Sequence, residues 1–383
     1  MVSGQKAGIY IHVPFCIKKC RYCNFYSLEK TDETMLKDYT YYLKQSIQLK
    51  SDNKTSVDSI YFGGGTPSLL SSEMIEEILK SVYKSFNVLN DCESTLEVNP
   101  GSVDSKYFKD LKNSGINRVN IGIQSFNDRL LKTIGRIHSS KKALQSFLDA
   151  RKAGFDNIGA DLIYSLPGQS ETDLLSDLSI MTGLKPDHIS AYMLTLEKNT
   201  PLFKMHKNNE LDFPCEDEQA EFFLKVYNYL KNNGYIFYEI SNYALSEEKF
   251  SRHNLKYWSQ KPYIGFGPSA HSYVHPYRWS EPESYEDWSD NIKNGKNENF
   301  FCEYIDQEKE KTEFIYLSLR TKKGLSFDEY NKRFLTDFAK DFSSVLELFF
   351  KENMIKSSNA GISLTEKGFL FSDYISLKFV ENI

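Results

Sequence analysis

The sequence predicts an α/β fold built around a parallel sheet, and two patterns carry this prediction. Six short runs rich in β-branched and aromatic residues are typical of strands, and longer amphipathic segments separate them. Repeated strand–helix units of this length imply parallel strands joined by right-handed crossovers. An open doubly wound sheet and a full or partial barrel both satisfy the pattern. In either one, functional residues gather at the carboxyl ends of the strands.

The predicted elements alternate along the first half of the chain. The strands are 8–13, 59–64, 94–99, 118–124, 158–165 and 188–194. The helices are 32–49, 71–86, 140–154, 171–184 and a segment near 216–232. A strand-like segment at 234–244 and an aromatic, glycine-rich region through 275 follow them.

The C-terminal part of the chain is predicted to form a separate small unit. Residues 291–301 are polar and rich in Asn and Lys, which is typical of a linker. Beyond it, two helical segments and a strand or wing indicate a compact winged-helix-like module. The predicted division is therefore 1–300 and 301–383.

Unusual residues follow five predicted strands at the same relative position. "CIKKCRYC" follows the first strand, "GGGTPS" the second, "NPG" the third, "QSF" the fourth and "SLPGQ" the fifth. Loops that only join elements have no reason to collect such residues at one end. One shared site at the carboxyl edge of the sheet is therefore the better interpretation.

Composition narrows the class of protein. The formal net charge is −5, so the sequence lacks the excess of positive charge that is typical of nucleic-acid-binding proteins. No run of eighteen apolar residues is present, and the first residues lack the design of a signal peptide. We therefore expect a soluble, cytoplasmic protein, and its composition leaves room for a peripheral membrane contact.

Three cysteines, Cys16, Cys20 and Cys23, follow the spacing C-x-x-x-C-x-x-C. Zinc sites favour four protein ligands, and His12 lies in a strand from which it converges poorly with the thiols. Three thiolates instead suit a cubane iron–sulfur cluster and leave one iron open for a small molecule. Cys92, Cys215 and Cys302 are scattered and are expected to be small, buried apolar residues.

The cysteine segment, with the aromatic residue Tyr22 directly before Cys23, resembles the signature of the radical S-adenosylmethionine (SAM) superfamily. The motifs "YIHVPFC", "YFGGGTPS", "EVNPGS", "RVNIGIQSFND", "LKTIGRIH", "DLIYSLPGQ" and "HNLKYW" resemble, in order, the subgroup related to oxygen-independent coproporphyrinogen III oxidase. The resemblance implies a partial (β/α)6 TIM-like barrel and a C-terminal domain of the HemN type. It also implies a [4Fe-4S] cluster whose open iron is chelated by SAM and whose electron cleaves SAM to a 5′-deoxyadenosyl radical.

The resemblance also implies which residues surround SAM. They are Tyr10, Tyr22, Gly63, Gly64, Gly65, Thr66, Glu97, Gln124, Arg136 and Asp161. Glycines let the backbone approach a ligand closely, although they also suit a tight strand–helix turn. A guanidinium pairs both oxygens of a carboxylate. Asp161 lies inside an apolar strand, where an acid needs a partner, and the resemblance implies ribose hydroxyls.

Two features distinguish the branches of this subgroup. The decarboxylating oxidases end the cluster motif with C-x-C and have a longer N-terminal arm, whereas here Phe25 stands two residues after Cys23. HemW-type haem chaperones have an aromatic residue at that place and an H-N-x-x-Y-W motif, present here from His253 to Trp258. The HemW-type branch fits better, and it implies haem binding and delivery to haem-dependent respiratory proteins.

Four residues are candidates for contact with haem: His253, Tyr257, Trp258 and His271. Histidine is a common axial ligand of haem iron, and aromatic rings offer flat apolar surfaces to a macrocycle. The aromatic residues also suit a core, and His253 also suits the cap of a turn. The sequence is compatible with a monomer and with a homodimer.

Three functions remain in competition. The first is a radical-SAM-type haem chaperone. The second is an oxygen-independent coproporphyrinogen III oxidase, which decarboxylates two propionate side chains in haem synthesis. The third, a zinc or iron–sulfur scaffold without SAM chemistry, leaves the glycines at 63–65, Glu97, Gln124, Arg136 and Asp161 unexplained together. Whether the protein is an enzyme stays open between the first two.

Overall fold

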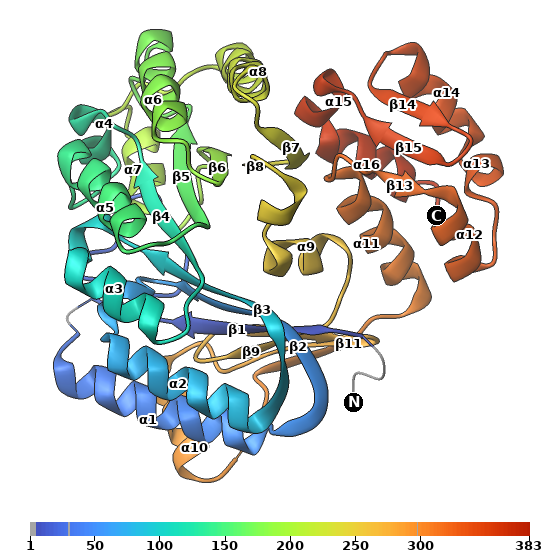
Figure 1. The fold of residues 1–383 in the computed structure, drawn as a ribbon. Coiled ribbons are helices and arrows are strands. Elements are labelled where there is room, and N and C mark those ends of the chain that lie inside the picture. Colours follow the sequence, from blue (N-terminus) through green and yellow to red (C-terminus); the bar gives the residue numbers. More distant parts are fainter. Residues whose placement is uncertain (1–4, 30, 297) are drawn as a thin grey trace.

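The computed structural model describes residues 5–29, 31–296 and 298–383. A curved sheet of twelve strands dominates these residues, in the order β12-β11-β10-β9-β1-β2-β3-β4-β5-β6-β8-β7 (Figure 1). Its centre consists of parallel neighbours: β1 (Ala7–Val13), β2 (Asp52–Gly64), β3 (Phe86–Val98), β4 (Arg118–Gln124), β5 (Ile158–Tyr164) and β6 (His188–Met193). All the strands predicted for this region are present, so the predicted parallel α/β class is confirmed.

Helices connect the parallel strands and cover the outer side of the sheet (Figure 1). They are α1 (Glu33–Leu49), α2 (Ser72–Ser85), α3 (Ser105–Asn113), α4 (Asp128–Thr133), α5 (Ser140–Lys152) and α6 (Glu171–Leu184). Helices α7 (Pro201–Lys207) and α8 (Glu216–Asn232) follow β6. Seven of the helices α1 to α8 start where a short polar side chain accepts a hydrogen bond from a free amide of the first turn. The capping residues are Asp32, Ser71, Asp104, Asn127, Ser139, Ser170 and Thr200.

Apolar side chains fill the space between the sheet and its helices. Ile9 and Ile11 of β1 are fully buried and belong to one core with Leu43 of α1 and Phe62 of β2. The face of each parallel strand that packs on the helices is apolar, so buried apolar residues recur at alternate positions along the strand. This is why the strand runs were recognisable in the sequence.

Further strands extend the sheet on both sides. On one side β8 (Asn242–Ala244) and β7 (Ile236–Glu239) continue antiparallel from β6. On the other side β9 (Tyr263–Phe266) pairs parallel with β1, and β10 (His271–Val274), β11 (Tyr277–Ser280) and β12 (Phe301–Tyr304) continue antiparallel. Helix α9 (Arg252–Trp258) lies between the two groups in sequence and follows β8.

The predicted linker at 291–301 is partly wrong. Helix α10 (Tyr285–Lys293) includes its first residues, because Trp288 and Ile292 are buried one helical turn apart. Residue 297 lies outside the described residues. Strand β12 includes its last residue and pairs with β11 of the large sheet, whereas the predicted division after residue 300 gives β12 to the second unit.

The C-terminal part combines helices with a small antiparallel sheet of order β13-β15-β14. Its elements are α11 (Gln307–Leu319), β13 (Leu325–Ser326), α12 (Phe327–Phe334), α13 (Phe338–Asp341), α14 (Ser343–Lys351), β14 (Ile355–Ser358), β15 (Gly361–Leu364), α15 (Glu366–Leu370) and α16 (Ser372–Val380). The antiparallel β14–β15 hairpin corresponds to the predicted wing. In the part of the chain that the structure describes, no helix has the length and apolar character to span a bilayer.

Candidate functional site

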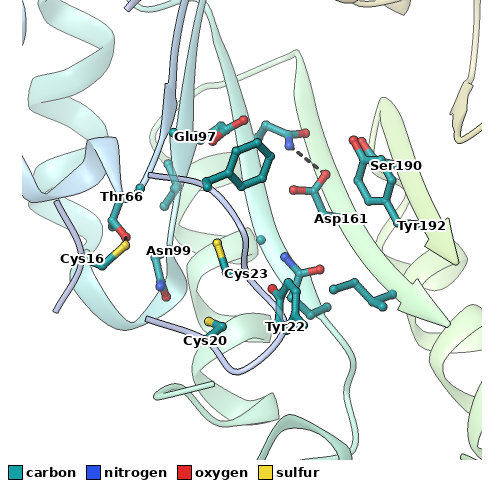
Figure 2. Close-up of a pocket in the computed structure, with 18 of the residues that line it drawn as sticks. Cys16, Cys20, Tyr22, Cys23, Thr66, Glu97, Asn99, Asp161, Ser190 and Tyr192 are labelled. Carbon is teal, nitrogen blue, oxygen red and sulfur yellow. Dashed lines mark hydrogen bonds between the residues drawn. The ribbon is translucent and has the colours of Figure 1, made fainter. Parts of the chain in front are cut away.

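A cavity of about 610 Å³ lies within the curve of the parallel strands. Its wall includes Cys16, Cys20 and Cys23, which follow β1, and side chains from β2 to β6 (Figure 2). The predicted SAM residues on the wall are Tyr22, Gly64, Gly65, Thr66, Glu97, Gln124, Arg136 and Asp161. The structure therefore brings the three cysteines and most of the predicted SAM residues to one place.

Tyr10 and Gly63 lie outside this wall. A Cβ atom on Gly63 would lie 3.1 Å from the ring of Tyr10 and 3.3 Å from Oε1 of Glu97. The Tyr10 hydroxyl is hydrogen-bonded to Nδ1 of His12 at 3.0 Å. Both residues therefore pack behind the residues that contact the cavity.

Backbone hydrogen bonds hold the cysteine segment together and fix it to α4. The Cys16 amide donates to the Leu28 carbonyl at 2.9 Å, and the Leu28 amide donates to the Pro14 carbonyl at 2.7 Å. Further along, the Arg21 amide donates to the Ile134 carbonyl at 3.0 Å, which ties the segment to the end of α4. The thiols are thus presented from an anchored backbone.

Protein donors reach two of the sulfur atoms. The Thr66 hydroxyl donates to Cys16 at 3.4 Å, and Nη1 of Arg136 donates to Cys20 at 3.4 Å. Burial raises the pKa of Cys23, and such a thiol gives up its proton when a metal centre binds it. Among the described residues, no three His, Cys, Asp or Glu side chains converge as ligands of a single metal ion. A cubane cluster is bound differently, by one thiolate at each iron.

The end of β2 brings the backbone close to the cysteine segment. The Gly65 amide donates to the Val13 carbonyl at 2.8 Å. A Cβ atom on Gly65 would lie 2.7 Å from the Phe15 carbonyl oxygen, which is closer than real Cβ atoms approach. Gly64 has φ +106°, a conformation that glycine adopts readily. Both residues therefore have structural reasons to be glycine, and both line the cavity.

Two carboxyl groups line the middle of the cavity. Burial raises the pKa of Glu97 to about 7, against the lowering effect of a hydrogen bond from the Tyr61 hydroxyl at 2.7 Å. Burial also raises the pKa of Asp161 to about 6, although Nδ2 of Asn120 donates to it at 2.8 Å (dashed in Figure 2). A ligand with a positive charge or hydroxyl donors would favour the ionised form of both groups.

Unpaired polar atoms on the wall also favour a polar ligand. Oε1 of Gln124 and Nε of Arg136 are buried and have no hydrogen-bond partner among the described residues. Gln124 has φ +69°, an uncommon conformation for a residue with a side chain, and such conformations concentrate at functional sites. Arg136 is oriented by a hydrogen bond from Nη2 to the Gly122 carbonyl at 2.8 Å. A donor and an acceptor are thus held in place without a protein partner.

None of the four predicted haem residues lines the cavity. His253 is 1% exposed, and both ring nitrogens are used: Nδ1 by the Ser59 hydroxyl at 3.1 Å and Nε2 by the Tyr257 hydroxyl at 2.9 Å. In this structure His253 therefore offers no free nitrogen to an iron, contrary to the expectation for an axial ligand. Trp258 is half-buried, and His271 is exposed at the start of β10.

Asn254 of the H-N-x-x-Y-W motif lines the wall. Sequence reasoning did not single out several other polar residues of the wall: Tyr61, Asn99, Arg118, Asn120, His188, Ser190 and Tyr192. A signal for five of them was present. Arg118 and Asn120 alternate with apolar residues in β4, and His188, Ser190 and Tyr192 do so in β6. Alternate side chains of a strand share one face, so these residues mark the face turned to the cavity.

Comparisons with known proteins match both parts of the chain. The model of the radical SAM superfamily matches residues 10–179, and that of the HemN C-terminal domain matches residues 305–371. The heme chaperone HemW of Lactococcus lactis is 31% identical over 97% of this chain and 96% of its own length. The heme chaperone HemW of Bacillus subtilis is 30% identical over 96% of this chain and 97% of its own length.

A solved structure with the same fold is that of coproporphyrinogen III oxidase (HemN) from Escherichia coli, a radical SAM enzyme. It covers 99% of this chain and 91% of its own, with a TM-score of 0.85 and 21% sequence identity. At this identity the likeness establishes the fold, which confirms the predicted radical SAM barrel with its C-terminal domain. The nearly full-length relatives establish the branch: the chain belongs to the heme chaperone HemW family of the radical SAM superfamily.

Proposed function

We propose that this protein binds a [4Fe-4S] cluster, SAM and haem, and that it delivers haem to haem-dependent respiratory proteins. The observation that carries the proposal is the cavity that gathers three cysteines with the unpaired polar atoms of Gln124 and Arg136. Two relatives named heme chaperone HemW, similar over nearly the whole chain, support the choice of haem as cargo.

In this proposal Cys16, Cys20 and Cys23 each hold one iron of the cluster. The hydrogen bonds from Thr66 and Arg136 stabilise the thiolates, because a donor favours the charged form of its acceptor. When bound, the cluster supplies one-electron reduction of SAM at its open iron.

The polar wall orients SAM. Glu97 would face a polar group of SAM as a carboxylate, and a hydrogen bond or positive charge from that group would lower the raised pKa of the free side chain. Gln124 and Arg136 offer an acceptor and a donor to polar groups of SAM, since each has an unpaired atom. Asp161 accepts hydrogen bonds from the ribose hydroxyls.

The proposal also includes the cellular location and the oligomeric state of the protein. The protein works in the cytoplasm as a monomer or homodimer and contacts haem acceptors at the membrane from outside the bilayer. The barrel carries the cluster and SAM, and the C-terminal module forms a second domain that begins after β12.

We expect anaerobically reconstituted protein to bind haem and to form no protoporphyrinogen from coproporphyrinogen III and SAM. Phe25 occupies the place where the decarboxylating branch has a further cysteine, which is the reason for expecting no turnover. A haem titration followed by absorbance and a chromatographic product assay test the two parts. Formation of protoporphyrinogen would establish the alternative, an oxygen-independent coproporphyrinogen III oxidase, and absence of haem binding would remove the proposed cargo.

A further inference from the structure

Helix α9 carries the H-N-x-x-Y-W motif and packs one histidine against the back of the cavity wall. The imidazole of His253 lies on the ring of Tyr61, with centroids 5.2 Å apart and planes 24° apart. Tyr10 stacks on the same imidazole at 6.1 Å and 28°. Tyr61 lines the cavity and His253 does not, so the histidine forms a layer behind the wall.

The orientation of this imidazole is fixed from several sides. Its two nitrogens are hydrogen-bonded to Ser59 of β2 and Tyr257 of α9. A Cβ atom on Gly8 of β1 would lie 2.9 Å from Nδ1, so the close approach depends on a glycine there. Because the imidazole cannot turn without breaking these contacts, it is a rigid support for the Tyr61 ring that stacks on it.

The supported residue is Tyr61, and its hydroxyl donates to Oε1 of Glu97 at 2.7 Å. This hydrogen bond fixes one oxygen of the carboxylate. It also favours the ionised form of Glu97 against the effect of burial. A displaced Tyr61 ring would therefore change both the orientation and the charge of Glu97.

We propose that His253 is a positioning residue for SAM binding, because it holds the Tyr61 ring in the orientation that keeps its hydroxyl on Glu97. The proposal rests on the proposed pairing of Glu97 with SAM. It gives the H-N-x-x-Y-W motif a role in the SAM site that is separate from any contact with haem.

The pH dependence of SAM binding reports on this arrangement. Titratable groups that act on Glu97 come from several elements: Tyr10, Tyr61, Asp161, Tyr192 and Tyr257. The Gly64 amide and the Tyr61 hydroxyl lower the pKa of Glu97, and Asp161 raises it. Loss of the Tyr61 hydrogen bond therefore raises the pKa of Glu97, and the carboxylate form that faces SAM is then lost at a higher pH.

The test uses the full chain with its cluster reconstituted and no haem present, so that a haem-ligand role of His253 makes no contribution. SAM dissociation constants are measured by equilibrium dialysis over a pH series that brackets neutrality. We expect Tyr61→Phe to weaken SAM binding about tenfold near neutral pH and to shift the midpoint upward by about one unit. His253→Ala should shift the pH midpoint in the same direction. In the Tyr61→Phe background, His253→Ala should change the SAM dissociation constant by less than about twofold.

Two variants separate positioning from general destabilisation. His253→Phe keeps a flat ring beside Tyr61 but loses both hydrogen bonds, so it should lower the melting temperature while leaving the pH midpoint near that of the wild type. His206→Ala removes an exposed histidine of α7 and should change neither. If His253→Ala fails to load its cluster, Tyr257→Phe takes its place, because it frees Nε2 and should produce a smaller upward shift.

The outcomes distinguish this inference from the proposed function. A wild-type protein that binds no SAM would overturn the SAM assignment and the inference together. A normal wild type and a shifted Tyr61→Phe variant, combined with an unshifted His253→Ala variant, would overturn the role of His253 alone. An equally large effect of His253→Ala in the Tyr61→Phe background would show that His253 does not act through Tyr61.

Discussion

Replacing Cys20 by Ala should abolish the iron–sulfur absorption band of the anaerobically reconstituted protein. The cavity wall carries three thiols, so a cluster with one open iron has no spare ligand once one of them is removed. The change also leaves Nη1 of Arg136 without the sulfur that it contacts at 3.4 Å. Iron and sulfide content, measured with the absorbance spectrum, should fall to near zero.

Cys302→Ala provides the matched control. The expected burial of the scattered cysteines is wrong for Cys215 and Cys302, which are exposed, and right for Cys92. Cys302 lies on β12, away from the cavity wall, so its removal should leave the cluster content unchanged. A persistent band in Cys20→Ala would refute the ligand assignment. A band lost in both variants would show that the reconstitution responds to cysteine number and not to this site.

Gly65→Ala should reduce both cluster loading and SAM binding, the latter by about tenfold or more, because it separates the end of β2 from the cysteine segment. The new Cβ atom would lie 2.7 Å from the carbonyl oxygen and 2.9 Å from the amide nitrogen of Phe15. These atoms belong to the backbone and can move only if the segment moves. Overpacking of this kind typically costs about 1–3 kcal/mol in stability. Denaturant unfolding and SAM dialysis measure the two effects.

Gly183→Ala is the control for replacing a glycine by alanine. Gly183 lies in helix α6, and a Cβ atom there meets nothing within 4 Å. Alanine should therefore stabilise the protein by about 0.5–1 kcal/mol, because it is the better helix former. Unchanged SAM binding in Gly65→Ala would mean that the close approach of β2 to the cysteine segment is not needed at the site.

The parallel strands were predictable because the face that each turns to the helices is apolar, so buried apolar residues recur at alternate positions in a short segment. Their residues at the carboxyl ends were predictable for the same reason: glycine, proline and cysteine interrupt the runs at a recognisable place. The outer elements were harder to predict. Strand β12 has only four residues, Phe301–Tyr304, and follows a polar stretch, so its pairing with β11 had no local signal.

Within the candidate site, the sequence indicated which segments contribute residues. It did not indicate which side chains line the cavity and which pack behind them. Tyr10 lies in the middle of β1 and Glu97 near the end of β3, and only Glu97 lines the cavity. His253 belongs to a recognisable motif, but its burial depends on Gly8 and Ser59, which lie in distant parts of the sequence. Contacts between residues so far apart in sequence result from tertiary packing, so they cannot be predicted from the periodicity of the sequence.

The pairing of SAM with a three-cysteine cluster is tested most directly by the electron paramagnetic resonance spectrum of the reduced, reconstituted protein, recorded before and after SAM is added. Cys16, Cys20 and Cys23 leave one iron without a protein ligand, so SAM binding at that iron should change the spectrum of the cluster. A spectrum that stays the same at saturating SAM would contradict the account.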